Sequence, residues 1–504
     1  MNRDVVISGG GPVGLMLACE LRLAGVDVLV VERLPEPDLT IKAGSVNMTT
    51  AEAFYRRGLL PAMDENVRQN AARIEEFLKS RGGGGPKPAM PVGHFAGIMV
   101  ASNGVDFADP DFRDVGPASR VVVIQQQAVE AILAARALEL GVEIRRGAEL
   151  TGFEADDDGV TVHLGDDRVR ASWLVGCDGG RSPVRKLAGF EFPGTDPAVT
   201  GRQAMAELSG ADKLPGGWQH GTGGLYVHGP MPGRMLTVEF DGPPADRDTP
   251  VTAQELEDSF RRVSGADVRV LKVHSATRFT DNARQASTYR LGRVLLAGDA
   301  AHVHSPFGGQ GLNLGIGDAV NLGWKLAATI QGWASEGLLD TYTTERHPIG
   351  EWVLEWTRAQ VALMRSDVRT KALRQVVGEL LRTDDGATYL AKKLSGVLHR
   401  YPLDGDHDLT GRGAPDFAFA DGTRLGEHLQ DGKALLLDLA DDAGLRQAAA
   451  GWGGRVNVLT AKSADDSSIT GVLIRPDGFI AWASEDGGTA GLDAALRRWF
   501  GEPA

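Results

Sequence analysis

Cysteine is scarce, because the chain of 504 residues contains only Cys19 and Cys177. Two thiols cannot build a disulfide framework or a thiolate zinc site, and we interpret both as packing residues. The eleven histidines show no HExxH or comparable ligand spacing, so no metal site is predicted. A chain with so few cysteines fits a reducing, cytoplasmic setting.

Long apolar runs are also missing. No stretch reaches the ~18 apolar residues of a membrane span, and the N-terminus lacks a basic region followed by an apolar one. The formal net charge of −14 argues against a nucleic-acid or anionic-membrane partner. The composition, 42% hydrophobic and 24% charged, is that of a globular protein, and the length predicts two to four domains. The oligomeric state stays open, a homodimer included.

The chain divides into segments with different hydrophobic patterns. Residues 1–188 and 279–398 alternate strands with helices and end in long helices, whereas residues 189–278 show the short alternating runs of an antiparallel sheet. A smaller α/β unit is predicted over residues 399–504. The sequence therefore predicts an α/β protein with an inserted antiparallel-sheet domain. The Gly/Pro-rich stretch 81–91 is predicted to be a surface loop.

The first predicted strand runs into glycines at Gly9, Gly11 and Gly14, the GxGxxG spacing of a dinucleotide site. Gly9 permits the tight turn, Gly11 lets the backbone approach a pyrophosphate, and Gly14 lets the helix pack closely on the sheet. The second strand ends at Glu32, which is placed to accept hydrogen bonds from the adenosine ribose; Arg33 is assigned to the same site. A chance glycine-rich turn is the alternative, but a strand precedes the motif and a helix follows it.

Two further clusters follow predicted strands at their C-terminal ends. Asp178 comes after the strand 173–176, and Asp299 after the strand 293–297. A carboxylate at such a position suits a polyol hydroxyl, so Asp299 is the candidate for the ribityl chain of FAD. Alone, Asp178 would pass for a turn residue and Asp299 for a helix cap, but three clusters in this order favour FAD over NAD.

A glycine-rich run, 306–313, then leads into a helix. Its backbone amides can stabilise negative charge on the N1/C2=O edge of a reduced flavin. The candidate contacts in this run are Pro306, Gly309, Gly311, Leu312 and Asn313. For His302 and His304, which precede the run, a capping role and a functional role are both open.

These motifs resemble those of the aromatic-ring hydroxylases, single-component FAD-dependent monooxygenases of the para-hydroxybenzoate hydroxylase type. The similarity is strongest to the actinomycete aromatic polyketide oxygenases, which include angucycline and tetracycline tailoring hydroxylases and rifampicin monooxygenase. It covers nearly the whole chain and includes the segments 124–130 and 318–326. In this family a glutamine corresponding to Gln126 lies against the cofactor, and the block 178–185 serves both FAD packing and NADPH engagement.

The resemblance implies a glutathione-reductase-type, Rossmann-like FAD domain and a C-terminal thioredoxin-like domain without redox cysteines. It implies that FAD is bound non-covalently and that NADPH and O₂ are co-substrates. The expected reaction is hydroxylation of a bulky polycyclic, polyketide-type aromatic through a flavin C4a-hydroperoxide. Baeyer–Villiger or oxidative ring-opening chemistry is the alternative, because both reactions need the same cofactor site. A halogenase is disfavoured, since the WxWxIP element is absent; a non-catalytic FAD-binding protein is a further alternative.

No catalytic side chain is singled out, because flavin oxygenation needs little acid–base equipment. Five residues are candidates for the substrate pocket, although each taken alone fits the core or the surface better than a ligand contact: His94, Phe95, Trp218, Tyr226 and His228. Two cofactor-side positions depart from the family pattern, since Lys42 and Thr49 stand where arginine is usual. Lysine keeps the charge without the bidentate fork and threonine loses the charge, so NADPH handling or flavin movement is expected to differ.

Overall fold

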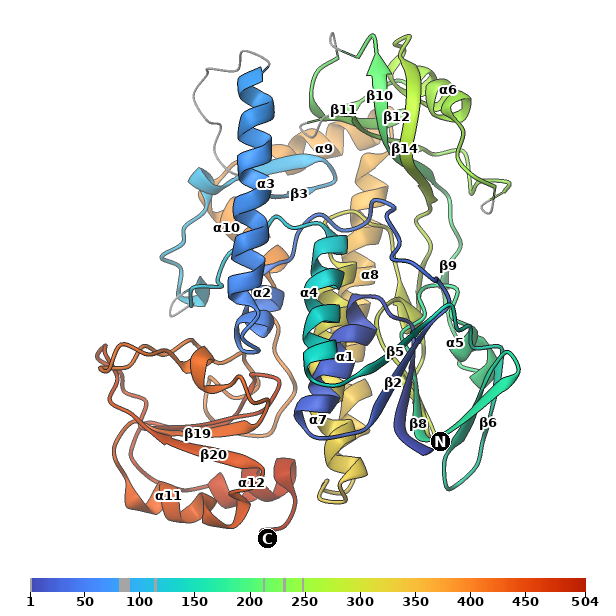
Figure 1. Ribbon diagram of the computed structural model, residues 1–504. Coiled ribbons are helices and arrows are strands. Elements are labelled where there is room, and N and C mark those ends of the chain that lie inside the picture. The colour runs from blue at the N-terminus through green and yellow to red at the C-terminus, as the bar shows by residue number, and fades with distance from the viewer. Residues whose placement is uncertain (1, 81–90, 113–115, 212–213, 230–232, 247–248) are drawn as a thin grey trace.

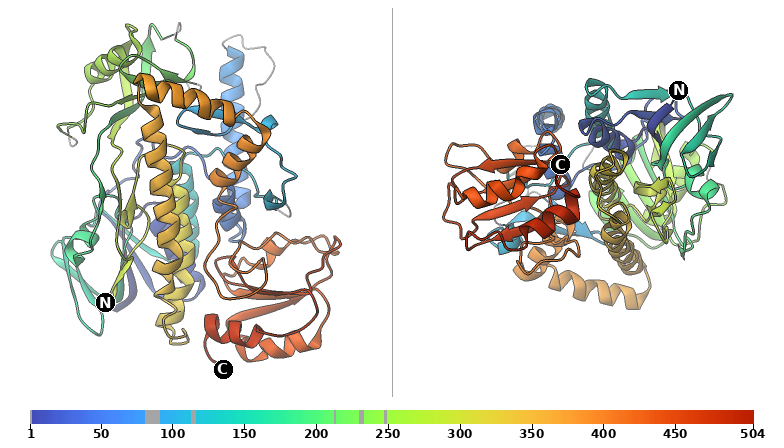
Figure 2. Two further views of the ribbon diagram at one scale, coloured as in Figure 1. Left: turned by 180° about the vertical axis from the view of Figure 1, so that it is seen from behind. Right: turned by 90° about the horizontal axis from the view of Figure 1, so that it is seen from below.

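The computed structural model describes residues 2–80, 91–112, 116–211, 214–229, 233–246 and 249–504. A mainly parallel sheet lies below an antiparallel sheet, and the C-terminal unit lies beside the former (Figure 1). The long helix α8 (Thr341–Met364) extends from the level of the parallel sheet to that of the antiparallel sheet (Figure 2). These features confirm the predicted mixed α/β architecture with an antiparallel region.

The parallel sheet places the sequence motifs at one edge. Its order is β16-β17-β8-β1-β2-β5, with β6 and β7 attached to β8. The strands are β1 (Asn2–Ser8), β2 (Val28–Glu32), β5 (Glu143–Arg146), β6 (Gly152–Ala155), β7 (Val160–Leu164), β8 (Asp167–Gly176), β16 (Arg290–Leu291) and β17 (Val294–Leu296). Ser8 pairs with Gly176, and Gly176 pairs with Leu296. Because these strands are parallel, the loops after β1, β8 and β17 emerge side by side.

Three helices accompany this sheet, and the first of them packs against the other two. They are α1 (Pro12–Leu23), α4 (Gln126–Glu139) and α7 (Gly311–Ile330). The second half of β1, Val5–Ser8, and the first four residues of β2, Val28–Val31, are buried, and all of them except Ser8 are apolar, as expected for a sheet covered on both faces. Cys19 is one of the buried residues of α1, and burial raises the pKa of its thiol to about 12, which agrees with a packing role.

The antiparallel sheet has the order β11-β12-β13-β10-β14. Its strands are β10 (Thr200–Ser209), β11 (Gly217–His220), β12 (Gly224–His228), β13 (Arg234–Glu239) and β14 (Arg269–Phe279), and α6 (Ala253–Ser264) covers one face. Short strands link it to the rest of the chain: β9 (Gly194–Thr195), β15 (Ala283–Gln285) and β18 (His302–Val303).

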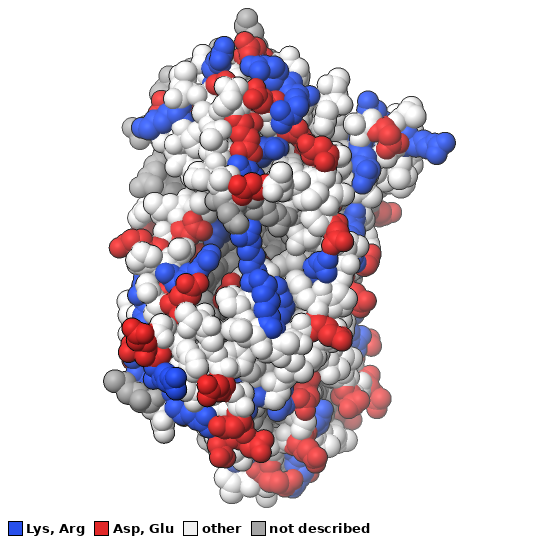
Figure 3. Space-filling model, turned by 90° about the vertical axis from the view of Figure 1, so that its right-hand side faces the viewer, with Lys and Arg blue, Asp and Glu red and all other residues white. Residues whose placement is uncertain are grey.

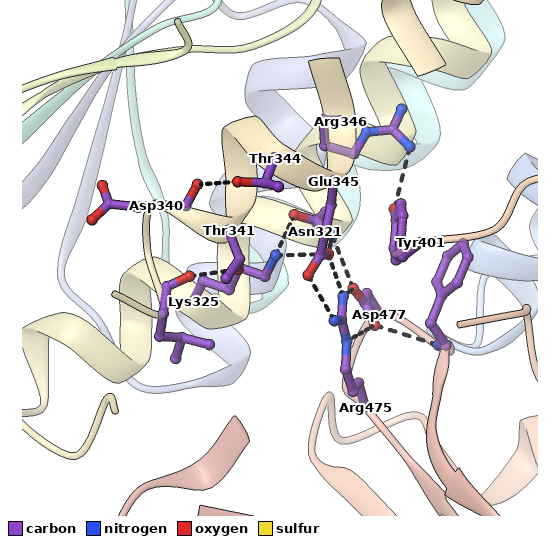
Figure 4. A network of polar contacts seen from close by, with 12 residues as sticks. Asn321, Lys325, Asp340, Thr341, Thr344, Glu345, Arg346, Tyr401, Arg475 and Asp477 are labelled. Atoms are coloured by element: carbon purple, nitrogen blue, oxygen red, sulfur yellow. Dashed lines mark hydrogen bonds and ion pairs between the residues drawn. The ribbon is translucent and has the colours of Figure 1, made fainter. Parts of the chain in front are cut away.

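A separate four-stranded sheet forms the C-terminal unit, in the order β20-β19-β21-β22. Its elements are β19 (Ala434–Asp438), α11 (Ala443–Ala449), β20 (Val456–Thr460), β21 (Gly471–Ile474), β22 (Ile480–Ser484) and α12 (Leu492–Phe500). The strand β20 is parallel to β19, whereas β21 and β22 are antiparallel neighbours. Buried polar residues join this unit to α7 and α8: Lys325 and Asn321 meet Glu345, which also pairs with Arg475 (Figure 4).

Several elements were not expected from the sequence. They are α2 (Met48–Tyr55), α3 (Leu60–Ser80), the hairpin β3 (Pro91–Phe95) and β4 (Ile98–Ala101), and the short α5 (Pro183–Ala188). The predicted long helices are α8, α9 (Val368–Leu380) and α10 (Asp384–Ser395). The helix α6 interrupts the segment expected to be all strand. Most of the predicted loop 81–91 lies outside the described residues.

Candidate functional site

The three motif glycines have different surroundings. Gly9 has a φ of +113°, and a Cβ there would stand 2.2 Å from the carbonyl oxygen of Cys177. A Cβ at Gly14 would stand 2.0 Å from the carbonyl oxygen of Gly9. A Cβ at Gly11 would meet nothing within 4 Å. The fold therefore requires glycine at two positions, whereas at Gly11 the protein leaves space open in front of the N-terminus of α1, where a pyrophosphate fits.

The carboxylate of Glu32 is fixed at the end of β2. Its Oε2 accepts a hydrogen bond from the backbone N–H of Gly10 (2.8 Å), and its Oε1 accepts one from Leu34 (2.9 Å). Each carboxylate oxygen has a second acceptor position, which can take a ribose hydroxyl. Arg33 is exposed beside it.

The loop after β8 contains an incompletely satisfied carboxylate. Asp178 Oδ2 accepts from Val184 N–H (3.1 Å), while Oδ1 is buried with no hydrogen-bond partner among the described residues. Burial raises the pKa of this carboxyl. Arg185 ties the loop to the next one, donating to the carbonyl of Ala300 (2.9 Å) and to that of Gly180 (2.8 Å).

Asp299 is exposed directly after β17, beside His304 and the N-terminus of α7. A Cβ at Gly311 would lie 3.5 Å from His304 Nε2 and 3.9 Å from Asp299 Oδ1. Nδ1 of His304 lies 2.8 Å from the carbonyl of Ser305, which can only accept, so Nδ1 holds the ring proton. Burial lowers the pKa of His304, which keeps the ring neutral. Its buried Nε2 is thus an acceptor with no hydrogen-bond donor among the described residues.

The first turn of α7, which follows the loop 306–310 (here called the α7 entry loop), presents N–H groups to the same place. The first helical bond runs from Leu314 N to Gln310 O (2.9 Å), so the three preceding residues have no intrahelical acceptor. Asn313 uses its side chain internally, because Nδ2 donates to Gly309 O (2.8 Å) and Oδ1 accepts from Asn47 N (2.9 Å). Its contribution to a ligand would therefore come from its backbone N–H.

These features fit FAD. Open space at Gly11, the orphaned acceptors of Asp178 and His304, the exposed Asp299 and the N-termini of two helices all lie at one edge of the parallel sheet. Acceptors without donors suit ribityl and ribose hydroxyls, and helix N-termini suit phosphates and a reduced flavin ring.

A second group of contacts holds the segment 38–43 near this edge. Gln126 donates from Nε2 to Glu130 (2.8 Å) and accepts at Oε1 from Ala43 N–H (3.5 Å). Gln203 of the antiparallel sheet donates to Ile41 O (2.6 Å). Lys42 is half-exposed and forms an ion pair with Asp38 (3.0 Å).

Thr49 lies at the start of α2 rather than in that segment. Its hydroxyl donates to Asn47 Oδ1 (3.1 Å), and a Cβ at Gly396 would stand 2.6 Å from its Oγ1. An arginine at this position would therefore have to project past the end of α10.

Three of the five predicted pocket residues come together on one side of the antiparallel sheet. The rings of His94 and Trp218 are 4.6 Å apart, and Trp218 meets Phe307 of the α7 entry loop edge-on at 6.0 Å. Phe95 packs edge-on against Trp356 of α8 at 4.7 Å. The apolar wall therefore spans the hairpin, the antiparallel sheet and the α7 entry loop.

Tyr226 does not join the other candidates, because it faces the opposite side of the sheet from Trp218. Its neighbours Leu225 and Val227 belong to the apolar cluster that contains Phe307. Tyr226 belongs to the cluster under α6 and packs on Phe260 at 5.1 Å. Since side chains alternate along a strand, His228 is on the same side as Tyr226.

Sequence reasoning missed a cation on the Trp218 side of the antiparallel sheet. Arg234 is on the same sheet face as Leu236 and Val238, and no carboxylate partner is found for it in the described part of the chain. Burial and the charge of Arg234 lower the pKa of His94 to about 4. Nδ1 of that neutral ring accepts from Gly97 N–H (3.3 Å), so Nε2 holds the proton and can donate. In the sequence, only the alternation of side chains along the strand Arg234–Glu239 could have indicated that Arg234 shares a face with Leu236 and Val238.

Asp318 was also missed, although it lies in a recognised motif. Its Oδ2 accepts from Gly298 N–H (3.0 Å) and lies 2.7 Å from His302 Nε2, while Oδ1 accepts from Arg346 Nε (2.8 Å). Burial raises the pKa of this carboxyl, but His302 and Arg346 lower it by more, so it stays ionised. Asp318 therefore fixes the turn that presents Asp299, and His302 has a structural role.

Other ligand classes place their own requirements on surface charge, metal-ligating side chains and apolar helices. Lys/Arg and Asp/Glu side chains are interspersed over the face in Figure 3, without a broad field of one sign. Within the described ranges, no group of three or more His, Cys, Asp or Glu side chains is arranged to hold a metal ion. No helix in those ranges is long and apolar enough to span a membrane.

Comparison with known families agrees with the geometry. Residues 2–357 match the family model described as FAD binding domain, and residues 407–503 match that described as aromatic-ring hydroxylase, C-terminal. The chain is 42% identical over 533 aligned positions, covering 100% of both chains, to 12-dehydrotetracycline 5-monooxygenase/anhydrotetracycline 6-monooxygenase of Streptomyces rimosus subsp. rimosus.

Two other similar proteins carry names for different reactions, a hydroxylation and a synthase reaction. The solved structure of OxyS anhydrotetracycline hydroxylase from Streptomyces rimosus superimposes with a TM-score of 0.88 at 41% identity, covering 100% of both chains. The chain is also 38% identical to a dialkyldecalin synthase of Streptomyces rugosporus, again over 100% of both chains. That relative is named for a synthase reaction rather than an oxygenation.

Proposed function

The chain belongs to the FAD-binding aromatic-ring hydroxylase family, and from this premise we propose that it oxygenates a bulky polycyclic aromatic of polyketide type. The reaction consumes NAD(P)H and O₂, with NADPH as the expected reductant. It converts R–H, O₂, NAD(P)H and a proton into R–OH, NAD(P)⁺ and water. The observation that supports this proposal is that one loop connects the FAD site with the aromatic wall. This loop contains Phe307, which contacts Trp218, and it leads into α7.

The proposed division of labour follows the units of the fold. Residues 1–188 and 279–398 bind FAD in a Rossmann-like domain of glutathione-reductase type, and residues 189–278 supply the substrate-side sheet. Residues 399–504 form a thioredoxin-like domain without a redox role, since they contain no cysteine. Their buried ionic contact with α8 suggests that this domain stabilises the helices behind the site.

Bound FAD would supply the redox chemistry, accepting a hydride and activating O₂. Glu32 would hold the adenosine ribose, the N-terminus of α1 the pyrophosphate, and Asp299 the ribityl chain. His304 Nε2 would accept a hydrogen bond from one further hydroxyl. The N–H groups of Gly311, Leu312 and Asn313 would stabilise negative charge that develops on the ring during reduction.

The aromatic wall would orient the substrate and exclude water. Trp218 and Phe307 offer ring faces and edges to a polycyclic ligand. His94 would donate from Nε2 to an oxygen of the substrate, and Arg234 would favour an ionised or electron-rich oxygen there. Exclusion of water keeps the reducing equivalents from being lost as H₂O₂.

The test uses purified protein with anhydrotetracycline and rifampicin as polycyclic probes. Wild-type protein is expected to hold FAD that denaturation releases, to oxidise NADPH faster when a probe is present, and to add one oxygen atom to that probe. NMR connectivity separates a new hydroxyl from the ring-inserted oxygen of Baeyer–Villiger chemistry. Colourless protein that cannot be reconstituted with FAD would contradict the proposal.

The synthase relative requires one further control. A non-oxidative cyclase would give a product isomeric with its substrate, without NAD(P)H. Reactions without reductant and under argon separate the two classes, because an oxygenase forms no product in either condition.

A further inference from the structure

The hairpin that presents His94 and Phe95 has an unusual turn. Two residues, Ala96 and Gly97, connect Phe95 to its partner Ile98, with φ values of +52° and +82°. Positive φ at both positions is the geometry of a type I′ turn, which favours Asn-Gly or Gly-Gly. Alanine pays a steric penalty at the first position, and such strain persists only where the surroundings impose it.

Gln360 of α8 supplies that constraint. Its Oε1 accepts a hydrogen bond from the backbone N–H of Ala96 (3.0 Å), and its Nε2 donates to the carbonyl of Phe307 (3.2 Å). Both Gln360 and Ala96 are fully buried, so neither hydrogen bond can be replaced by water without rearrangement. One amide therefore connects the hairpin turn to the α7 entry loop.

The connected elements are the two walls of the proposed substrate site. On one side, a Cβ at Gly97 would touch Trp218 at 3.3 Å, and the Gly97 N–H fixes the tautomer of His94. On the other side, Phe307 begins the glycine turn of the α7 entry loop, and a Cβ at Gly308 would stand 3.0 Å from Gln360 Nε2. A change in either wall therefore alters the hydrogen-bond geometry of Gln360.

We propose that Gln360 is a positioning residue that holds the β3–β4 turn at a fixed distance from the α7 entry loop and so sets the shape of the substrate site. The inference rests on the proposed function for its catalytic consequence. Its structural part, the constraint on the turn, can be measured without a substrate. A glutamine suits this role because it accepts and donates from one rigid plane, which glutamate or methionine cannot do.

The first experiment measures hydrogen exchange in the FAD-loaded enzyme. Gln360→Met is expected to raise exchange in a peptide spanning residues 92–101 by about tenfold or more, the change that corresponds to ~1.4 kcal/mol of local opening. Thr357→Val is the matched control, since this equally buried residue one turn earlier bonds only to Leu354 O within α8 (3.0 Å). Unchanged exchange in Gln360→Met would overturn the proposal.

A second variant tests the origin of the effect. Ala96→Gly removes the steric penalty of the turn, so in the Gln360→Met background it is expected to return exchange in residues 92–101 most of the way to wild type. Failure of this rescue would mean that Gln360 does not act through the turn. If Gln360→Met does not fold, Gln360→Glu serves instead: it keeps an acceptor for Ala96 and loses the donor to Phe307, so exchange is expected to rise in a peptide spanning the α7 entry loop and to stay near wild type in residues 92–101. Unchanged exchange in the α7 entry loop would then overturn the proposal.

The catalytic readout separates positioning from general stability. With a probe that wild type oxidises, Gln360→Met is expected to raise KM about tenfold and to release more H₂O₂ per NADPH, while FAD affinity stays within about threefold. If Gln360→Met and Thr357→Val have the same KM and release the same amount of H₂O₂ per NADPH, the proposed effect of Gln360 on catalysis is contradicted. If wild type oxidises no probe, the proposed function fails, whereas the exchange result still decides the role of Gln360.

Discussion

Arg475 and Glu345 form a two-point ion pair across the boundary between the C-terminal unit and α8. Nη1 lies 2.9 Å from Oε1 and Nη2 lies 2.7 Å from Oε2. Neither side chain is more than 2% exposed, and the guanidinium also lies 4.4 Å from the centre of the Trp499 ring. Burial opposes ionisation of Glu345, but the charges of Arg475 and Lys325 lower its pKa. The pair therefore stays charged inside the protein (Figure 4).

Replacing Arg475 with methionine is expected to destabilise the protein by about 3–5 kcal/mol, because Glu345 and Asp477 stay buried without their shared cation. Thermal unfolding followed by circular dichroism measures the loss. Arg497→Met is the control, since Arg497 is 42% exposed in its pair with Asp493 and should leave the midpoint nearly unchanged. Equal midpoints for the two variants would show that the interface does not depend on this pair.

The motif glycines give a paired prediction. Gly14→Ala is expected to lower the melting temperature of the protein even without FAD, because the new methyl would clash with the carbonyl of Gly9. Gly11→Ala is expected to fold normally but to bind FAD at least tenfold more weakly, since its methyl enters the space left for the pyrophosphate. Thermal unfolding without FAD measures the melting temperature of both variants, and flavin fluorescence titration measures their FAD affinity. Full FAD affinity in Gly11→Ala would contradict the phosphate assignment.

Asp299→Ala is expected to weaken FAD binding by about tenfold to a hundredfold, as a charge-assisted hydrogen bond contributes ~1.5–3 kcal/mol. Folding should be unaffected, because Asp299 is exposed. Asp166→Ala, at the exposed turn between β7 and β8, serves as the control. Equal FAD affinity of the two variants would remove Asp299 from the ribityl site.

His94 predicts a pH effect on stability. Burial and Arg234 lower its pKa to about 4 in the folded protein, whereas an unfolded histidine titrates near ~6.5. Between these values the unfolded chain binds a proton that the folded chain does not, so acidification from pH 7 to pH 5 favours unfolding. His94→Gln should therefore lose less melting temperature over this interval than wild type. The exposed His274→Gln should behave as wild type does.

Arg234→Met is expected to raise KM for an oxygen-rich polycyclic probe by about tenfold, with FAD affinity unchanged, because a charged hydrogen-bond donor is lost from the wall. Steady-state NADPH oxidation measures KM. Arg269→Met, at the exposed start of β14, is the control. A normal KM in Arg234→Met would place the substrate elsewhere.

Sequence reasoning predicts the cofactor edge from signals that are local. Gly9 directly follows β1, Gly14 lies in the first turn of α1, and Asp299 closely follows β17, while parallel strands bring their C-terminal ends together by geometry alone. The substrate side was harder to predict. Tyr226 and Trp218 look alike in sequence, but strand pairing places them on opposite faces of the sheet.

The chain by itself determined the α/β order, the dinucleotide turn and the absence of redox cysteines in the last hundred or so residues, since these depend on residue type and short spacing. Only the tertiary structure decided that Arg234 faces the same side of the antiparallel sheet as Trp218, that Asp318 holds the turn at Asp299, and that Gln360 joins Ala96 to Phe307. The reason is physical: these contacts join residues far apart in sequence, and packing rather than local propensity selects them.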